Sequence, residues 1–461
     1  MRPVSLDSRA ALARAPAICT KGTELHQVLR APAAPRPSYR LSAARTCAVI
    51  ALCCVPISTA LTNIASGLFA VLLLSTPEFW RKLPSLRRHG AAMATLVLLA
   101  ALAGSTLYST AGMHEAWSWM GKYLKLLLVP FAIVAFADSE WDGIVRWALF
   151  VTLSTTLLLS TTNYLGLTHI GPSYIATDPA GHALVFRNRI ANGLFGALLF
   201  YQAADLALAA TRTRARWVYA GIAALALANV LVMLQGRTGQ VIVVLFALAV
   251  AARAAWQARQ KMRGRAAIGS AALLLAATTL VAYACTMHGS RIRAVASEVQ
   301  AYRQSDAVTS TGLRLEWYRK CVELIRARPL MGYGAAGLGA EFAKLTKGET
   351  GAKGIDTSNP HNEYLLMAVQ LGIPGALLFV NMLVQIGRRG ARLAPHSRHL
   401  LLAWLAAFAI GSLANSLLLD FAEGHMFALL SGILLGCGYR SGARSAASAR
   451  ESHVAGQAAA R

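Results

Sequence analysis

Residues 361–386 read HNEYLLMAVQLGIPGALLFVNMLVQI, an apolar stretch long enough to cross the hydrocarbon core of a membrane. A helix rises about 1.5 Å per residue, so about 20 apolar residues span roughly 30 Å of hydrocarbon. Similar stretches recur along the chain, in which 56% of the 461 residues are hydrophobic and only 14% are charged. Backbone groups inside lipid must find hydrogen-bond partners within the chain. The sequence therefore predicts an all-α fold that is integral to the membrane.

The sequence predicts about twelve membrane-spanning helices. The apolar stretch at 46–77 is too long for one helix, and we interpret it as two short ones that divide near Asn63–Gly67. The other predicted spans are 90–109, 121–138, 143–165, 190–210, 217–235, 239–253, 267–286, 361–386, 399–419 and 422–439. The predicted organisation is a disordered cytoplasmic tail at 1–45, spans 1–9 at 46–286, a long loop at 287–360, spans 10–12 at 361–440 and a cytoplasmic tail at 441–461.

The basic residues indicate which side of the membrane each connection occupies, because cytoplasmic loops carry an excess of Lys and Arg. With the N-terminus inside, the cytoplasmic connections contain the basic clusters, and only the connection around Asp138–Asp142 lacks one. This alternation predicts both termini in the cytoplasm and 287–360 outside it, with an amphipathic helical cap near Thr311–Ala327. It also accounts for the net charge of +25 without one contiguous basic face, so nucleic acid is not expected as a partner.

Four arginines on the predicted outer side run against this trend: Arg187, Arg189, Arg237 and Arg314. Something must offset the cost of placing them there. The planar guanidinium fork suits phosphate oxygens, so the group is interpreted as a binding site for an anionic ligand. The alternative for any one of them is that the side chain extends to lipid headgroups.

His361 is the strongest candidate for a catalytic residue. The run Ser358–Glu363 is typical of a helix start, with Asn359 as N-cap and Pro360 in the first helical position. His361 would then lie in the first turn of a span, where the positive helix end favours a neutral ring that can accept a proton. The alternative is a capping or interfacial histidine. Asp420, which ends a later span, could orient a ring nitrogen, pair with an outer arginine or simply face water.

The outer loops show no convincing set of metal ligands, so neither a metal nor another cofactor is expected. A GxGxxG at Gly332–Gly337 does not indicate a dinucleotide site, because no strand precedes it. These glycines are expected to let the backbone bend after Pro329.

These pieces together resemble the O-antigen ligase family. His361-Asn362, followed after nine residues by Gly372-Ile373-Pro374-Gly375, matches the family pattern His-[Asn/Ser/Gln]-x9-Gly-x-x-[Gly/Thr/Tyr]. The segment RARPLMGYG at 326–334 is similar to the one that precedes this histidine in the wider superfamily of O-antigen ligases and polymerases. The turn Gly236–Gly239 resembles its arginine-containing outer turn, with Gly in place of the usual Ser. The resemblance covers about 45–440.

The resemblance implies a glycosyltransferase of the lipid-donor, GT-C-like type that inverts the anomeric centre without a metal. The implied donor is an undecaprenyl-pyrophosphate-linked polysaccharide, the acceptor is lipid A–core oligosaccharide, and the reaction occurs at the periplasmic face of the bacterial inner membrane. By position, His361 matches the essential histidine of the family and Arg237 its outer-turn arginine. Arg189, with Arg187, matches the arginine before the sixth span. Asp420 corresponds loosely to an acidic residue near the eleventh, and Asn362 is assigned a supporting role.

Three other functions remain open at this point. An O-antigen polymerase uses the same donor as its acceptor, and a protein O-oligosaccharyltransferase of the superfamily glycosylates protein hydroxyls. A transporter of polysaccharide or lipid is the alternative from a different class. Transporters typically show charges within the membrane or internal repeats, and the sequence shows neither clearly.

Overall fold

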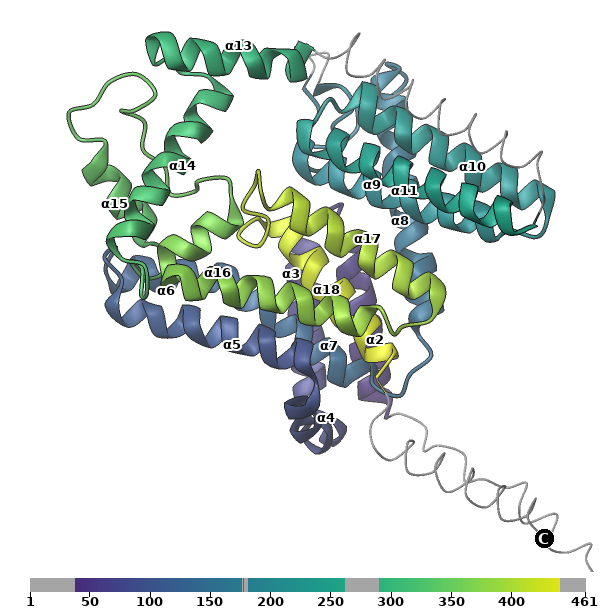
Figure 1. Ribbon diagram of the computed structural model, residues 1–461. Coiled ribbons are helices and arrows are strands. Elements are labelled where there is room, and N and C mark those ends of the chain that lie inside the picture. The colour runs from purple at the N-terminus through teal and green to yellow at the C-terminus, as the bar shows by residue number, and fades with distance from the viewer. Residues whose placement is uncertain (1–37, 176, 178–180, 262–289, 440–461) are drawn as a thin grey trace, which may run out of the picture. The chain divides into compact units, whose positions relative to one another are not determined.

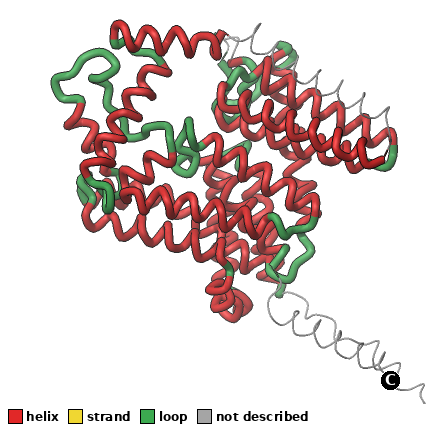
Figure 2. The backbone as a smooth tube through the Cα atoms, viewed as in Figure 1, coloured by secondary structure: helices red, strands yellow, loops and turns green. Residues whose placement is uncertain are grey.

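The computed structural model describes residues 38–175, 177, 181–261 and 290–439. Every regular element in these ranges is a helix, which confirms the all-α prediction (Figure 2). Seven helical segments in the described part of the chain are long and apolar enough to cross a membrane, as expected of a multi-pass membrane protein. They are Gly90–Tyr108, Met113–Phe136, Asp142–Tyr164, Arg189–Ala209, Thr213–Met233, Arg237–Gln257 and Glu363–Gly390.

These seven segments contain α5 (Gly90–Ser105), η2 (Thr106–Tyr108), α6 (Met113–Tyr123), η3 (Leu124–Leu127), α7 (Leu128–Phe136), α8 (Asp142–Tyr164), α9 (Arg189–Ala209), α10 (Thr213–Ala228), η5 (Asn229–Met233), α11 (Arg237–Lys261) and α16 (Glu363–Gly390). The other helices are α2 (Tyr39–Cys54), α3 (Thr59–Leu74), α4 (Pro77–Lys82), η1 (Leu83–Arg88), α13 (Ser290–Ser305), α14 (Ser310–Ala327), α15 (Gly337–Leu345), α17 (Pro395–Gly411) and α18 (Phe421–Cys437). The predicted span at 267–286 lies outside the described residues.

The first two helices differ from their predicted bounds. Helix α2 begins at Tyr39, within the residues assigned to the N-terminal tail, and the break before α3 falls at 55–58. The predicted division near Asn63–Gly67 was wrong. Pro56 has no N–H to continue α2, and the Ser58 side chain caps α3 by accepting from the backbone N–H of Leu61.

Helix α16 is broken where it meets a glycine-rich segment. Gly372 has φ +73° inside the helix, and a Cβ added there would lie 2.5 Å from the backbone of Leu330. The freed groups pair with that segment: the Ile373 N–H donates to the Pro329 carbonyl at 2.7 Å, and the Tyr333 N–H donates to the Val369 carbonyl at 2.8 Å. Only glycine adopts this backbone without strain, so the motif glycine is a packing requirement.

The packing of α16 places its N-terminal end among several elements. Helix α16 lies along α5 and also contacts α14, α15, α17 and α18, while α9 packs against α10, α11 and α17 (Figure 1). The predicted amphipathic helix near Thr311–Ala327 is confirmed as α14, whose Trp317, Cys321 and Leu324 are buried. Helix α14 therefore contacts both α13 and α16, and His361 lies two residues before α16 begins.

Candidate functional site

His361 does not lie within a helix. Helix α16 begins two residues later, and Asn362 is its N-cap, with Oδ1 accepting from the Leu365 N–H at 3.0 Å. The Asn359 side chain accepts instead from the His361 N–H at 2.8 Å. The prediction that Asn359 caps the helix and Pro360 begins it was therefore wrong. His361 has φ +54°, a left-handed conformation that no residue of a right-handed helix adopts.

The His361 ring is half-buried against α14. Its centroid lies 5.7 Å from that of Trp317, and the Tyr318 hydroxyl lies 3.0 Å from the His361 carbonyl oxygen. Burial lowers the pKa of the His361 imidazole, and the positive charge of Arg314 lowers it further. The ring is consequently neutral near pH 7 and able to accept a proton. The expected neutral ring is thus explained by burial and by the charge of Arg314. It does not require His361 to lie in the first turn of a helix.

Arg314 is the predicted arginine whose charge acts on His361. It lies on α14 one turn before Tyr318, and burial lowers the pKa of its guanidinium. Among the described residues nothing accepts a hydrogen bond from Arg314 or forms an ion pair with it. A half-buried guanidinium that lacks a hydrogen-bond partner among the described residues can donate to an anion that binds near His361.

Arg237, in contrast, is already paired. Its guanidinium donates to Glu298 Oε1 at 2.9 Å and to Thr311 Oγ1 at 3.1 Å, which connects the start of α11 to α13 and α14. Burial raises the pKa of Glu298, but the hydrogen bonds from Arg237 and Thr311 outweigh it, so the pKa is lowered overall. A phosphate at Arg237 would have to share the guanidinium with this carboxylate. This pairing is not evident from the sequence, because Glu298 lies 61 residues away along the chain.

Arg187 and Arg189 lie at the start of α9. Arg187 donates to the Val55 carbonyl at 2.9 Å and to Thr59 Oγ1 at 3.0 Å, and its guanidinium lies 5.6 Å from the Phe421 ring. Its Nη2 is buried and finds no acceptor among the described residues. Arg189 is the first residue of α9, and its backbone carbonyl approaches the Arg237 turn, because a Cβ added at Gly236 would lie 3.0 Å from it.

The connection between α17 and α18, residues 412–420, joins these groups. The Leu413 carbonyl accepts from Asn362 Nδ2 at 3.0 Å and lies 3.0 Å from the Tyr318 hydroxyl. The Asn415 amide donates to Thr238, next to Arg237, at 3.0 Å. The connection ends at Asp420, directly before Phe421 and the Arg187 guanidinium. Asn362 and Thr238, which neighbour His361 and Arg237, therefore contact this connection directly, and Arg187 lies beside the residue that follows it.

Asp420 acts in the structure through its backbone. Its carbonyl accepts from Lys125 Nζ at 2.5 Å, and no side-chain hydrogen bond caps α18. The neighbouring Glu363 is fully buried, and its Oε2 accepts from the Leu418 N–H at 2.8 Å. Glu423 is buried as well. The ionisable side chains of Lys125, Glu363 and Glu423 all lie within apolar helical segments. The sequence interpretation that charges within the membrane are not clearly present therefore needs correction.

Lys125, Glu363 and Glu423 could have been found from the sequence. An ionisable residue within an apolar stretch is costly and usually functional. Lys125 lies near the edge of the predicted span 121–138, and Glu363 directly follows the candidate residues His361 and Asn362.

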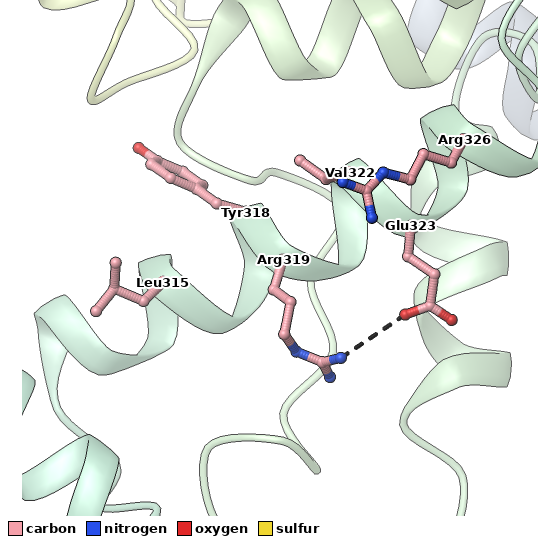
Figure 3. A pocket seen from close by; sticks show the side chains of 6 residues that line it. All are labelled: Leu315, Tyr318, Arg319, Val322, Glu323 and Arg326. Carbon is pink, nitrogen blue, oxygen red and sulfur yellow. Dashed lines mark ion pairs between the residues drawn. The ribbon is translucent and has the colours of Figure 1, made fainter.

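A cavity lies along α14. It has a volume of about 590 Å³ and is lined by Leu315, Tyr318, Arg319, Val322, Glu323 and Arg326 (Figure 3). Tyr318 links this surface to the His361 backbone. Arg319 forms an ion pair with the buried Glu316 at 2.5 Å, so its charge is largely balanced, whereas Arg326 has no hydrogen-bond partner among the described residues. The cavity is mixed in character, with an aromatic ring, the paired Arg319 and the unpaired Arg326 among the described residues.

Comparison with known proteins agrees with this arrangement. A family model described as O-antigen ligase matches residues 222–380. The matched range includes Arg237, α14 with Arg314, and the His361-Asn362 pair, whereas Arg187, Arg189 and Asp420 lie outside it. No curated protein shows a significant match to the chain. Residues 222–380 therefore match the O-antigen ligase family, which supports the resemblance that the sequence motifs show.

Proposed function

We propose that this protein is an O-antigen ligase that transfers a polysaccharide from undecaprenyl pyrophosphate to lipid A–core oligosaccharide. The observation that carries the proposal is a half-buried His361 whose pKa is lowered by burial and by the charge of Arg314, a guanidinium without a partner among the described residues. Both residues lie within the matched range. A proton acceptor next to a cation is what transfer of a sugar from a pyrophosphate requires. The protein would be a lipid-donor, GT-C-like transferase with about twelve spans in the bacterial inner membrane, and its site would face the periplasm.

In the proposed reaction, a hydroxyl oxygen of the acceptor sugar bonds to the anomeric carbon of the donor. The bond from that carbon to the pyrophosphate oxygen breaks, and its electron pair leaves with undecaprenyl pyrophosphate. The hydroxyl proton passes to the free ring nitrogen of His361 and from there to solvent. Because the hydroxyl attacks opposite the leaving group in one displacement, the anomeric centre inverts.

The arginines have distinct roles in this proposal. Arg314 and Arg187 would contact the pyrophosphate, because each has donors without an acceptor among the described residues. Arg237 would hold α13 and α14 in place through Glu298 and offer its remaining N–H groups to the donor. Arg189 would contribute from the start of α9. These cations replace a divalent ion in balancing the charge of the leaving group, so the transfer is proposed to be metal-independent.

Asn362 and Asp420 would position the backbone around the site. Asn362 fixes the start of α16 directly after His361, and Asp420 ends the connection that Lys125 holds. The cavity along α14 would offer the acceptor sugar a surface whose Tyr318 also contacts the His361 backbone. The surrounding membrane lipids would hold both substrates in one leaflet, which aligns them for reaction.

A strain that lacks the gene tests this function against its alternatives. Lipid A–core without polymer, together with long lipid-linked polymer, is the result expected for a ligase. Short polymer chains on lipid A–core would identify a polymerase instead. Normal lipopolysaccharide with unglycosylated protein would identify a protein O-oligosaccharyltransferase, and lipid-linked polymer trapped on the cytoplasmic face would identify a transporter.

A further inference from the structure

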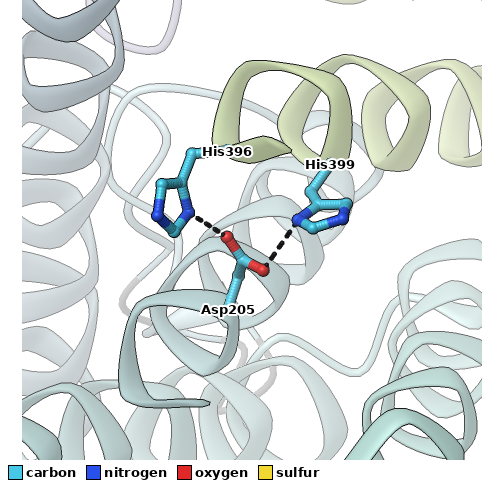
Figure 4. A group of neighbouring side chains, drawn as sticks. All are labelled: Asp205, His396 and His399. Carbon is cyan, nitrogen blue, oxygen red and sulfur yellow. Dashed lines mark hydrogen bonds and ion pairs between the residues drawn. The ribbon is translucent and has the colours of Figure 1, made fainter. Parts of the chain in front are cut away.

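A second cluster of polar side chains lies where α9 and α17 meet, away from His361. Asp205 is buried on α9, and His396 and His399 lie one turn apart on α17 (Figure 4). His396 Nδ1 lies 2.7 Å from Asp205 Oδ2, and His399 Nδ1 lies 2.9 Å from Asp205 Oδ1. The three side chains point toward one another, and their potential ligand atoms all lie within 4.8 Å of each other.

The protein contacts alone leave this cluster incompletely satisfied. Arg253 donates to Asp205 Oδ1, and its Nη1 also lies 3.3 Å from His399 Nδ1. An arginine can only donate, so it requires a lone pair on that nitrogen, whereas Asp205 requires a proton there. A single nitrogen cannot meet both demands. A cation among the three side chains removes the conflict, because it binds the nitrogen lone pair and the carboxylate oxygen together.

The cluster also borders a cavity of about 10 Å³, which suits a single ion or water and no organic ligand. Gln202 lines the same cavity and is only 8% exposed. Its Nε2 donates to the Arg146 carbonyl at 2.9 Å, but its Oε1 is buried without a partner among the described residues. A buried amide oxygen without a donor is unusual and costly. It is available as a fourth ligand, directly or through a water.

We propose that Asp205, His396 and His399 bind a divalent transition-metal ion of the zinc class. Two imidazole nitrogens and one carboxylate oxygen suit Zn²⁺ or Co²⁺, whereas Mg²⁺ and Ca²⁺ prefer sites made of oxygen alone. Arg253 then acts as an outer partner that orients the carboxylate, as hydrogen-bonded groups commonly do around metal ligands.

The role of this ion is structural. It connects α9 to the N-terminal end of α17, and about 18 Å of helix separates His399 from Gly411, where the connection around His361 begins. The ion is therefore too far from His361 to act on the transferred sugar. It fixes the helix that leads into the 412–420 connection. The proposal is independent of the transfer reaction and does not conflict with a metal-free mechanism there.

Metal binding by the purified full-length protein, without a histidine tag, tests the inference. The detergent-solubilised protein is stripped with chelator, loaded with Zn²⁺ and desalted, and its zinc content is measured by mass spectrometry. About one zinc per chain is expected, with a rise of about 2 °C or more in the unfolding midpoint. Loading with Co²⁺ should give the visible absorption of a tetrahedral site.

Three variants distinguish this site from adventitious binding. Asp205→Asn and His399→Ala should each weaken zinc affinity by at least about tenfold. His114→Ala removes an exposed histidine elsewhere and should leave affinity unchanged. If Asp205→Asn fails to fold, His399→Ala still tests the site, because it retains the Asp205–Arg253 pair. Wild-type protein that loses its zinc on desalting, or variants that bind zinc as tightly as wild type, would show that the cluster is an ion-pair network alone.

Discussion

At the scale of single residues, the role of each side chain at the site depends on whether its hydrogen-bonding groups already have partners. His361 has its backbone fixed by Asn359 and Tyr318 while its ring stays available. Arg314 carries a charge with no partner among the described residues, whereas Arg237 is held by Glu298 and Thr311. These differences assign different roles to residues that look equivalent in the sequence.

His361→Ala should abolish transfer while leaving donor binding nearly intact. The ring acts on the acceptor hydroxyl, and loss of a general base typically slows a reaction about a hundred- to ten-thousandfold. Single-turnover transfer and donor binding are measured on folded, membrane-inserted protein, with Arg314→Ala as the comparison. If His361→Ala binds donor as poorly as Arg314→Ala does, His361 is a pyrophosphate ligand and the assignment as base is wrong.

The acid limb of the pH–rate profile for transfer should report the environment of the His361 ring. The base must be deprotonated, so the rate falls as the pH drops through its pKa. Because burial and Arg314 both lower that pKa, the limb should lie below about pH 6.5, the ordinary histidine value. Arg314→Gln removes the second cause and should move the limb upward. The measurement is single-turnover rate against pH at saturating donor, and an unchanged limb in the variant would separate Arg314 from His361.

The Arg237–Glu298 pair can be tested by changing each partner in turn. Arg237→Ala should weaken donor binding about ten- to a hundredfold, the value of one charge-assisted contact. Glu298→Gln keeps an acceptor for Thr311 but removes the competing charge, so donor affinity should stay the same or increase. Equal losses of donor affinity in both variants would mean that Arg237 only holds α13 and α14 together.

At the scale of elements, the break in α16 is what joins the two family motifs. The glycine-rich segment after Pro329 bends as the sequence predicts, with Gly332 at φ +66° and Gly334 at φ +79°. Its backbone then pairs with the opened turn of α16 around Gly372. The spacing of nine residues between His361-Asn362 and Gly372 thus sets the distance from His361 to this junction.

Gly372→Ala should destabilise the protein by about 1–3 kcal/mol or more, since the new Cβ meets backbone and the φ is unfavourable. Gly67→Ala is the matched control, because Gly67 lies inside α3 with open space where the Cβ would go. The control should be neutral or slightly stabilising, by about 0.5–1 kcal/mol. The unfolding midpoints of both variants in detergent give the comparison. A stable Gly372→Ala protein would mean that the junction tolerates a side chain.

At the scale of the whole molecule, the proposed function depends on which side of the membrane the site faces. The alternation of basic clusters predicts both termini in the cytoplasm and 287–360 on the other side. Seven spans are recognisable by length and apolar character in the described residues, and the bent pair Thr59–Leu74 and Pro77–Arg88, at 76°, is a further candidate. The predicted count of twelve stays a prediction.

Two reporter fusions test the orientation. A fusion at Gly351 should be active only for an extracytoplasmic reporter, and a fusion at Arg392 only for a cytoplasmic one. Alkaline phosphatase and a fluorescent protein provide the two readouts. A cytoplasmic signal at Gly351 would contradict the topology and place His361 on the wrong side for periplasmic transfer.

The sequence by itself determined the all-helical membrane class and the presence of α14, because length, hydropathy and periodicity are local properties of the chain. Its short motifs made His361 the candidate base, which stays a prediction. It misplaced the start of α16, since Asn359 and Asn362 are both good caps and only the fold shows which one is used. The tertiary structure alone revealed that Glu298 occupies Arg237 and that Asp205 meets His396 across 191 residues. Such contacts depend on how helices pack, and the packing energy involves residues that are distant in the sequence.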